Sequence, residues 1–325
     1  MYSTRILLAA VLLPLMLLVS TVQAQTASRV IRTIDERCAI CHGDNVNDAP
    51  RVEGAVSRDT LQQMAPESIL QAITIGAMRI HAEGITDEVK LAMAEFISGR
   101  KIGPIEAGAA ENMPNRCAAT TDMNIQAGNA QWNGWSPDST NARFQPNPGI
   151  SAADVPELEL KWAFGFPGVS SVYGQPTIVD DRVFVGVDTG YVYALDAQTG
   201  CVHWSFLAES GVRNAISIER VDGQPGRLAA YFGDIRANAY SVDAETGELI
   251  WKTKVDPHPL AVVTGAPTLH EGRLYVPVSS REEAAGGSLN YPCCTFRGSI
   301  VALNSATGSQ LWKSYAIPDA PVPDK

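Results

Sequence analysis

Beyond its first 24 residues, this 325-residue sequence has no apolar run long enough to cross a lipid bilayer. It also lacks an excess of basic residues, because 25 lysines and arginines stand against 35 aspartates and glutamates, a formal charge of −10. A chain of this charge is a poor ligand for nucleic acid or an anionic membrane surface, so neither is expected as a partner. Its 45% of hydrophobic residues is nevertheless ordinary for a folded protein.

The long apolar run that the sequence does contain lies at the N-terminus. Arg5 precedes Ile6–Val19, and residues 22–24 (Val-Gln-Ala) supply the small residues that a signal peptidase requires. Such a run is typical of a cleaved secretory signal, with an uncleaved anchor as the alternative. We therefore expect a signal peptide over residues 1–24 and a periplasmic location.

Three regions follow the expected signal. Residues 25–100 show helical spacing: Pro66 stands where a helix could begin, and another helix is predicted from Thr86 to Gly99 with Phe96 on its buried stripe. Residues 101–130 are rich in glycine, proline, alanine and asparagine and have no apolar period, which predicts a linker or an extended strap. From residue 131 to 325 the pattern is that of short β-strands.

The β region contains an internal repeat. The segment Ala194–Trp204 recurs as Ser241–Trp251 and as Ala302–Trp312. In each copy an apolar strand ends in Asp or Asn, turns through Thr-Gly, and resumes as a strand that carries a tryptophan. Glycine permits the positive φ of such a turn, and the Asp side chain can accept bonds from the turn's amides.

The repeated tryptophans, Trp204, Trp251 and Trp312, are 47 and 61 residues apart, a period typical of stacked or radial β units. A large flat indole at one place in each unit suits the packing of one unit on the next. The spacing resembles the tryptophan-docking motif of quinoprotein β-propellers, and a β-sandwich is the alternative. The resemblance implies an incomplete propeller of about three to four blades.

Covalent haem attachment is predicted by Cys38-Ala-Ile-Cys41-His42, which supplies two thiols for the vinyl groups and a histidine for the iron. A structural disulfide or a zinc half-site is the alternative, although a zinc site needs a second ligand pair and Cys117 is far along the chain. Residues 25–100 are similar in scale to a small helical class I cytochrome c domain.

The sixth iron ligand is expected to be Met78, because class I cytochromes place their axial methionine in a loop before a helix. Three other side chains compete for this role: His81, Met64 and Met93. Pro50 is a candidate to accept the Nδ1 proton of His42 through its carbonyl, which would fix the tautomer of the ring.

A haem motif, a linker and a docking-motif propeller, in this order, resemble the quinohaemoprotein alcohol dehydrogenases of the polyvinyl-alcohol-dehydrogenase type. Trp132–Trp135, Asn141–Arg143 and Cys293–Cys294 also carry the resemblance, which runs along the whole mature chain. It implies that pyrroloquinoline quinone (PQQ) oxidises an alcohol, with Ca²⁺ polarising the quinone. Covalent haem c would then pass electrons singly to an external redox protein, such as another cytochrome.

In this family a disulfide between adjacent cysteines covers one face of the quinone. The segment Tyr291–Gly298 resembles that region, which implies a Cys293–Cys294 disulfide and a quinone contact for Arg297. Arg213 and Asn214, in the turn after the first repeat strand, are expected to face a central channel, which makes Arg213 a second candidate contact. The alternatives are two reduced thiols and two solvated arginines.

By elimination, Cys117 and Cys201 are then predicted to form a long-range disulfide that ties the linker to the first repeat; two free buried thiols are the alternative. The sequence holds fewer docking motifs than propellers of this class have blades. The catalytic aspartate and part of the Ca²⁺ shell would lie on blades beyond residue 325.

Two functions therefore stand. The chain is either the N-terminal fragment of a quinohaemoprotein alcohol dehydrogenase or a non-catalytic electron-transfer protein with a propeller-like binding module.

Overall fold

The computed structural model describes residues 27–43, 48–52, 54–74, 76, 78–103, 105–119, 122–123, 125, 131–137, 140–169, 171–221, 223–224, 226–286, 291 and 293–322. The expected signal peptide lies outside these residues. None of the described helices is both long and apolar enough to span a membrane. The chain divides between Ile102 and Gly103 into two compact units, which are described separately.

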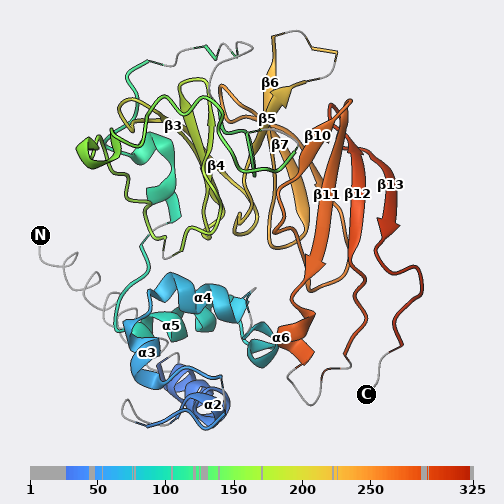
Figure 1. The fold of residues 1–325 in the computed structure, drawn as a ribbon. Coiled ribbons are helices and arrows are strands. Elements are labelled where there is room, and N and C mark those ends of the chain that lie inside the picture. The colour runs from blue at the N-terminus through green and yellow to red at the C-terminus, as the bar shows by residue number, and fades with distance from the viewer. Residues whose placement is uncertain are drawn as a thin grey trace, which may run out of the picture. The chain divides into compact units, whose positions relative to one another are not determined.

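The first unit is helical (Figure 1). A helix over residues 27–37 is followed by α2 (Ala39–His42), α3 (Arg58–Gln63), α4 (Pro66–Thr74), the 3₁₀ turn η1 (Arg79–Ala82) and α5 (Asp87–Ser98). Pro66 opens α4, where its missing N–H removes no helical hydrogen bond. Gly99 ends α5 with a φ of 66°, a left-handed conformation that glycine adopts freely. Both predicted helix boundaries are confirmed, whereas α3 was not predicted.

The core of the helical unit is a single apolar cluster. It comprises Val30, Ile34, Ile69, Ile73, Ala82, Val89, Met93, Ala94 and Ile97. The prediction that Phe96 is buried is wrong, because its side chain is 51% exposed. The buried stripe of α5 centres on Met93 and Ile97, so Phe96 falls at the edge of that face.

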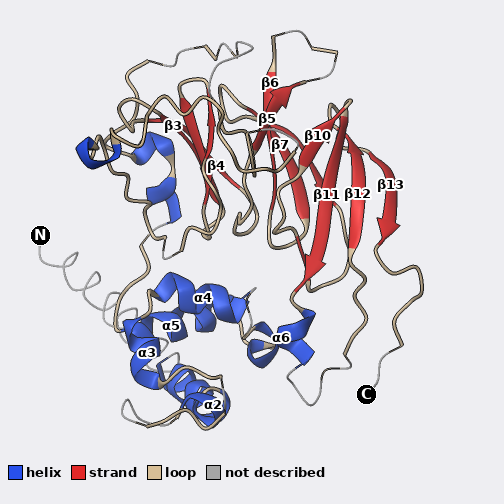
Figure 2. Ribbon diagram, viewed as in Figure 1, coloured by secondary structure: helices blue, strands red, loops and turns tan. Residues whose placement is uncertain are grey.

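The second unit consists mainly of three antiparallel sheets, drawn in red in Figure 2. The first contains β1 (Thr177–Val179), β2 (Arg182–Gly186), β3 (Tyr191–Asp196) and β4 (Val202–Leu207). The second contains β5 (Ser217–Arg220), β6 (Leu228–Gly233), β7 (Asn238–Asp243) and β8 (Leu249–Lys254). The third contains β10 (Thr268–His270), β11 (Arg273–Ser280), β12 (Ser299–Asn304) and β13 (Gln310–Tyr315), with β9 (Ala261–Val262) paired to β11.

Within each sheet the four main strands neighbour one another in chain order, which is the meander of a propeller blade. The predicted repeat occupies the third and fourth strands of each sheet. Its tryptophans take equivalent positions in the register: Trp204 opposite Ala194, Trp251 opposite Ser241, and Trp312 opposite Ala302. The prediction of stacked β units is confirmed.

Of the two predictions for residues 101–130, a linker or an extended strap, the described residues fit the strap. The 3₁₀ turns η2 (Ile105–Gly108) and η3 (Ala110–Asn112) belong to the β unit, and Ala110 and Met113 are buried against Tyr193 and Val202 of the first sheet. The apolar outer face of this sheet requires a cover. A strap of small residues can approach it closely, so the domain boundary moves to residues 102–103.

Residues 131–137 lie between the first strands of two sheets. Trp132 exchanges backbone hydrogen bonds with Ile178 of β1, at 2.7 and 2.8 Å. The side chain of Asn133 donates to the carbonyl of Ile218 of β5 and accepts from its amide, at 2.6 and 2.7 Å. This segment therefore joins the first and second sheets. Among the described residues, this segment contributes a single β-bridge, between Trp132 and Ile178.

Candidate functional site

The two cysteines of the predicted haem motif lie on one helical turn. The amide of Cys38 donates to Ile34 O, and the amides of Cys41 and His42 donate to Cys38 O, at 2.9, 3.1 and 3.0 Å. Both thiols are free and partly exposed. Burial raises the pKa of the Cys38 thiol, and Arg58 opposes that shift. Side chains three residues apart share one face of a helix, so both thiols are presented to the same side.

The ring of His42 is held by Val56 and not by Pro50. Its Nδ1 lies 2.8 Å from Val56 O, whereas Pro50 is exposed. The expectation for Pro50 is therefore corrected: the chain returns to the histidine ring six residues later than predicted. A bond from Nδ1–H to a carbonyl leaves the lone pair of Nε2 for a metal.

Met78 lies at the start of η1 and packs partly buried against the same apolar cluster as Cys38. His81, its main rival, is exposed, and Met93 is 1% exposed within the core. Met64 also borders the cluster. Among the competitors, the structure therefore distinguishes Met78 from His81 and from Met93, but not from Met64.

The β unit is joined by tryptophans that reach from one repeat into the next. The Nε1 of Trp204 donates to Ala244 O (3.0 Å), and that of Trp251 donates to Ser305 O (2.8 Å). Each acceptor belongs to the turn of the following sheet. Because the indole lies on the glycine of that turn, a Cβ at Gly247 would be 2.7 Å from the Trp204 ring.

Trp162 makes the same contact with the first sheet, donating to Ala197 O at 3.1 Å and lying on Gly200. The repeat pattern missed it because Glu157-Leu158 stands where the other copies have Thr-Gly. The spacing from Asp154 to Trp162 nevertheless equals that from Asp196 to Trp204, and this was the available signal.

Two predicted disulfides are present. Cys117 and Cys201 are bonded with their Cα atoms 5.1 Å apart, and the bond ties the strap to the first sheet. Cys293 and Cys294 are bonded to each other, in the connection between the helix α6 (Glu282–Gly286) and β12.

A buried carboxylate holds the segment around the adjacent cysteines. Glu282, whose side chain is 4% exposed, accepts from Tyr291 Oη (2.8 Å), the Thr295 amide (2.6 Å) and the Phe296 amide (2.8 Å). Burial alone would raise the pKa of Glu282, but these hydrogen bonds outweigh it and the pKa is lowered. His258 Nε2 lies 3.8 Å from the carboxylate and 3.0 Å from Thr295 Oγ1.

Arg281, which precedes Glu282 in the chain, lies close to Arg213, and the two arginines form a cationic cluster. The Arg213 guanidinium stacks over Tyr173 at 4.0 Å, and its Nε is buried without a hydrogen-bond partner among the described residues. Burial and the charge of Arg213 lower the pKa of Arg281. Two adjacent guanidinium groups with an unmatched donor fit a carboxylate ligand. Sequence reasoning missed Arg281, because nothing in the sequence distinguishes it from a surface arginine.

Arg297 and Asn214, which the sequence analysis named with Arg213 and the adjacent cysteines, make contacts of a different kind. Arg297 stacks over Tyr315 of β13 at 3.6 Å and not over the aromatic ring that Arg213 contacts. Asn214 is 2% exposed and bonds to Gly233 and Val263, so its role is to join the second sheet to the start of the third. The expectation that Asn214 faces a channel is corrected.

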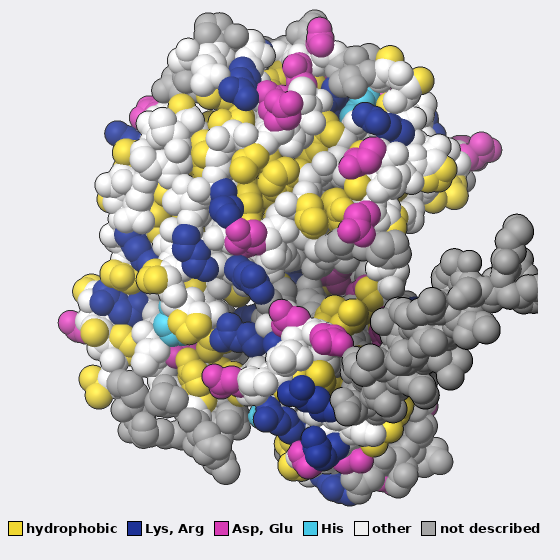
Figure 3. Space-filling model, turned by 180° about the vertical axis from the view of Figure 1, so that it is seen from behind, with side chains coloured by type: hydrophobic (Ala, Val, Ile, Leu, Met, Phe, Trp, Pro, Cys, Tyr) yellow, Lys and Arg dark blue, Asp and Glu magenta, His cyan; other side chains and the backbone are white. Residues whose placement is uncertain are grey.

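Within the described residues, no group of three or more His, Cys, Asp or Glu side chains could hold a metal ion. On the face shown in Figure 3, basic and acidic side chains are interspersed and form no field of one sign.

Meander sheets joined in series by docked tryptophans define a repeat protein of the β-propeller type. Residues 147–316 match the family model described as "PQQ_2: Outer membrane protein assembly factor BamB". The chain belongs to this family.

The relatives include two polyvinylalcohol dehydrogenases. The protein from Pseudomonas sp. is 39% identical over 299 residues, and that from Sphingopyxis sp. (strain 113P3) is 40% identical over 302 residues. These alignments cover 88% and 89% of the present chain and 45% of each relative, so the chain spans about half the length of both.

Among solved structures, a quinohemoprotein alcohol dehydrogenase from Comamonas testosteroni is similar, with 21% identity and a TM-score of 0.49. The match covers 58% of this chain and 27% of that one. A europium-containing methanol dehydrogenase gives 20% identity and a TM-score of 0.47, with 57% and 32% covered.

Proposed function

We propose that this chain takes part in the quinone-dependent oxidation of an alcohol, with its helical unit serving as a c-type cytochrome that accepts the electrons. The observation that carries the proposal is the 39–40% identity to polyvinylalcohol dehydrogenases along nearly nine tenths of the chain. The substrate class is accordingly a polymeric or small alcohol, and the final acceptor is another redox protein.

Haem c would be held by thioether bonds to Cys38 and Cys41, with His42 and Met78 as axial ligands. Two free thiols on one helical face, and a histidine whose Nδ1 is engaged by Val56, support this assignment. A methionine ligand favours a high reduction potential, which an acceptor of electrons needs. A periplasmic location, where such attachment takes place, is part of the proposal and rests on residues 1–24.

PQQ, when bound, supplies the oxidant for the alcohol. Its carboxylates fit the guanidinium groups of Arg213 and Arg281, and the buried Nε of Arg213 provides an unused donor. The bonded Cys293–Cys294 pair, held by Glu282 through the next two amides, would cover one face of the flat ring system. No group of three or more His, Cys, Asp or Glu side chains comes together among the described residues, and no step is assigned to Ca²⁺.

The haem-type motif of the helical unit, with two free thiols on one helical face, is by itself compatible with a second candidate function. In this alternative the chain binds and transfers electrons but performs no substrate chemistry. The two candidates share the haem site and differ only in whether the β unit binds PQQ and supports oxidation of an alcohol.

Expression in a bacterium with a cytochrome c maturation system tests the haem site first. We expect a covalent haem spectrum that disappears in the Cys38→Ala/Cys41→Ala variant, and a chain that stays haem-free would refute it. PQQ is then titrated with Ca²⁺ present. Arg213→Ala should weaken binding at least about tenfold, while Arg220→Ala, an exposed arginine elsewhere on the unit, should not.

Reduction of the haem on addition of polyvinyl alcohol to the PQQ-loaded chain would establish that the chain oxidises an alcohol. A chain that binds haem but neither PQQ nor alcohol would leave the electron-transfer alternative.

A further inference from the structure

The predicted sixth iron ligand, Met78, lies in the connection between α4 and α5. On the α4 side, the Gly76 amide donates to Gln71 O (2.8 Å) and the Met78 amide donates to Ala72 O (3.0 Å). Beyond Met78 the chain forms η1, whose last residue, Ala82, is 3% exposed within the apolar cluster. A short 3₁₀ turn has poor hydrogen-bond geometry, so side chains from other segments decide how firmly this connection is held.

One arginine ties this connection to the predicted haem motif. The Nη1 of Arg37 donates to Glu83 O (2.8 Å) and to His81 O (3.3 Å), which lie 46 and 44 positions further along the chain. Arg37 ends the helix over residues 27–37 and immediately precedes Cys38. A single guanidinium therefore links the segment that carries the two thiols to the segment that carries Met78.

The two acceptors explain why an arginine suits this position. Carbonyls in the last turn of a helical segment lack a helical donor, and His81 O belongs to the last turn of η1. A hydrogen bond from a charged donor is stronger than one between neutral groups. Because Arg37 is exposed, each bond contributes modestly, but both act on the connection that carries Met78.

A second arginine makes the same kind of contact beside the competing methionine. The Nη2 of Arg100, which follows α5, donates to Gln63 O (3.1 Å) and to Met64 O (2.5 Å). These bonds hold the end of α3, whereas those of Arg37 hold the connection between α4 and α5. Removing either arginine removes bonds to backbone carbonyls of the same unit, so the two substitutions form a matched pair.

We propose that Arg37 is a positioning residue for the axial methionine, because it holds the connection over residues 78–85 closed and so keeps Met78 in place as an iron ligand. The inference rests on the proposed haem site. Arg37 acts through the backbone of His81 and Glu83. An external ligand binds the iron only after the methionine has left, so its apparent affinity is proportional to the fraction of protein with the connection open.

Imidazole titration of the oxidised, haem-loaded full chain measures that fraction. Arg37→Gln should raise the apparent affinity for imidazole at least about threefold and weaken the methionine-to-iron charge-transfer band. Arg37→Lys should change the affinity less than about twofold, because both bonds come from one nitrogen and an ammonium group can replace it. Arg100→Gln is the matched control and should also stay within about twofold of the wild type, although it loses bonds to Gln63 and Met64.

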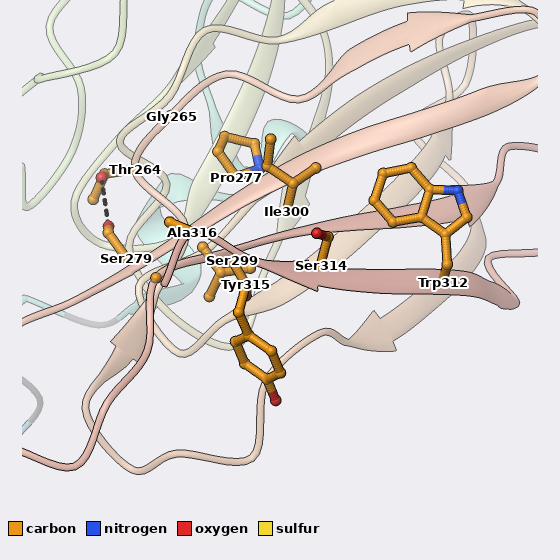
Figure 4. Close-up of a pocket in the computed structure, with 12 residues that line it drawn as sticks. Thr264, Gly265, Pro277, Ser279, Ser299, Ile300, Trp312, Ser314, Tyr315 and Ala316 are labelled. Carbon is orange, nitrogen blue, oxygen red and sulfur yellow. Dashed lines mark hydrogen bonds between the residues drawn. The ribbon is translucent and has the colours of Figure 1, made fainter. Parts of the chain in front are cut away.

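A variant of the β unit provides a further control. Ser314 lines a groove on the third sheet together with Trp312 and Tyr315 (Figure 4). Ser314→Ala removes one exposed hydroxyl from that groove and should leave the imidazole affinity unchanged. An affinity raised as much by Ser314→Ala or Arg100→Gln as by Arg37→Gln would overturn the inference.

The remaining outcomes separate the inference from the haem site itself. A wild-type chain that attaches no haem would refute the haem site and the inference with it. A haem-loaded wild type that lacks the methionine band, or an Arg37→Gln variant with the imidazole affinity of the wild type, would overturn the inference alone.

A haem-free measurement covers the case in which Arg37→Gln attaches no haem. In the full chain carrying Cys38→Ala/Cys41→Ala, trypsin cleavage after Arg79 reports opening of the connection, and cleavage after Arg58 of α3 reports unfolding of the whole unit. Arg37→Gln should raise the ratio of the two rates at least about threefold, because proteolysis follows the open population. An unchanged ratio would overturn the inference.

Discussion

Trp251 lies flat against Gly308, so that a Cβ added to this glycine would be 2.6 Å from the indole Cδ2. The two residues are 57 positions apart and belong to consecutive sheets. The same pairing joins Trp204 to Gly247 and Trp162 to Gly200. The Thr-Gly turn is thus both a hairpin element and the seat of the neighbouring sheet's tryptophan, which explains why the two occur together in the repeat.

Gly247→Ala should destabilise the β unit by about 2–5 kcal/mol, because the new methyl group meets the Trp204 ring and the backbone has a φ of +77°. Gly223→Ala is the matched control, with a φ of +72° and no atom within 4 Å of the added Cβ. It should cost only about 1–2 kcal/mol. Urea unfolding followed by tryptophan fluorescence measures both. Equal costs would show that the indole contact contributes nothing.

Met78→Ala should abolish the weak methionine-to-iron charge-transfer band of the oxidised haem protein and lower its potential, because the thioether ligand is lost. His81→Ala is the control and should retain both properties, since the His81 side chain is exposed. Met93→Ala should instead destabilise the helical unit by about 2–5 kcal/mol, because Met93 is a core residue. A spectrum kept by Met78→Ala and lost by His81→Ala would reverse the assignment.

Glu282→Gln should lower stability at about pH 7 by about 1–3 kcal/mol, since it removes a charged acceptor from two buried amides. Because folding lowers the pKa of Glu282 below its ordinary value of 4.5, the carboxylate's contribution is present above that value and is lost as the pH falls through the lowered pKa. The difference from wild type should therefore shrink in acid.

Hydrogen exchange of the Thr295 and Phe296 amides, together with urea unfolding at about pH 7 and about pH 4, measures this effect. His258 and Tyr291 also face the carboxylate, so the same comparison in a His258→Gln background isolates the effect of the Glu282 carboxylate. Glu283→Gln, at an exposed neighbouring position, is the control. A difference that grows in acid would contradict the direction of the pKa shift.

Replacing both Cys117 and Cys201 with serine should destabilise the β unit by about 4 kcal/mol, because the bond closes a loop between residues 84 positions apart. Peptide mapping without reduction should recover the two cysteines in one cross-linked fragment. Alkylation of either cysteine in the native, oxidised protein would show that the pair is not bonded.

Local sequence signals located most of the elements whose boundaries depend on residues close by in the chain. Pro66, Thr86 and Gly99 marked helix boundaries correctly, because capping and proline chemistry act within one turn. The Thr-Gly repeat placed the third and fourth strands of each sheet. An extended strap was one of the two predictions for residues 101–130, but its burial over residues 105–117 could not be foreseen, because that burial depends on an apolar sheet face formed by residues some 80 positions later.

The candidate site residues also divide into those that nearby sequence brings together and those that only the fold brings together. Cys38, Cys41 and His42 are adjacent in the chain, and one helical turn suffices to bring them together. The acceptor of the His42 proton was assigned to Pro50, but the fold supplies Val56. The approach of Arg281, which follows β11, to Arg213, which lies between β4 and β5, arises only when different sheets are packed together.

The sequence by itself determined the haem-type motif, the repeat and the chemistry of its turn, because each depends on residues within about ten positions of one another. Only the tertiary structure decided which glycine each tryptophan covers and which arginines meet. Those outcomes depend on the packing of one sheet on the next, where residues about 50 positions apart come into contact and a buried donor must find its acceptor.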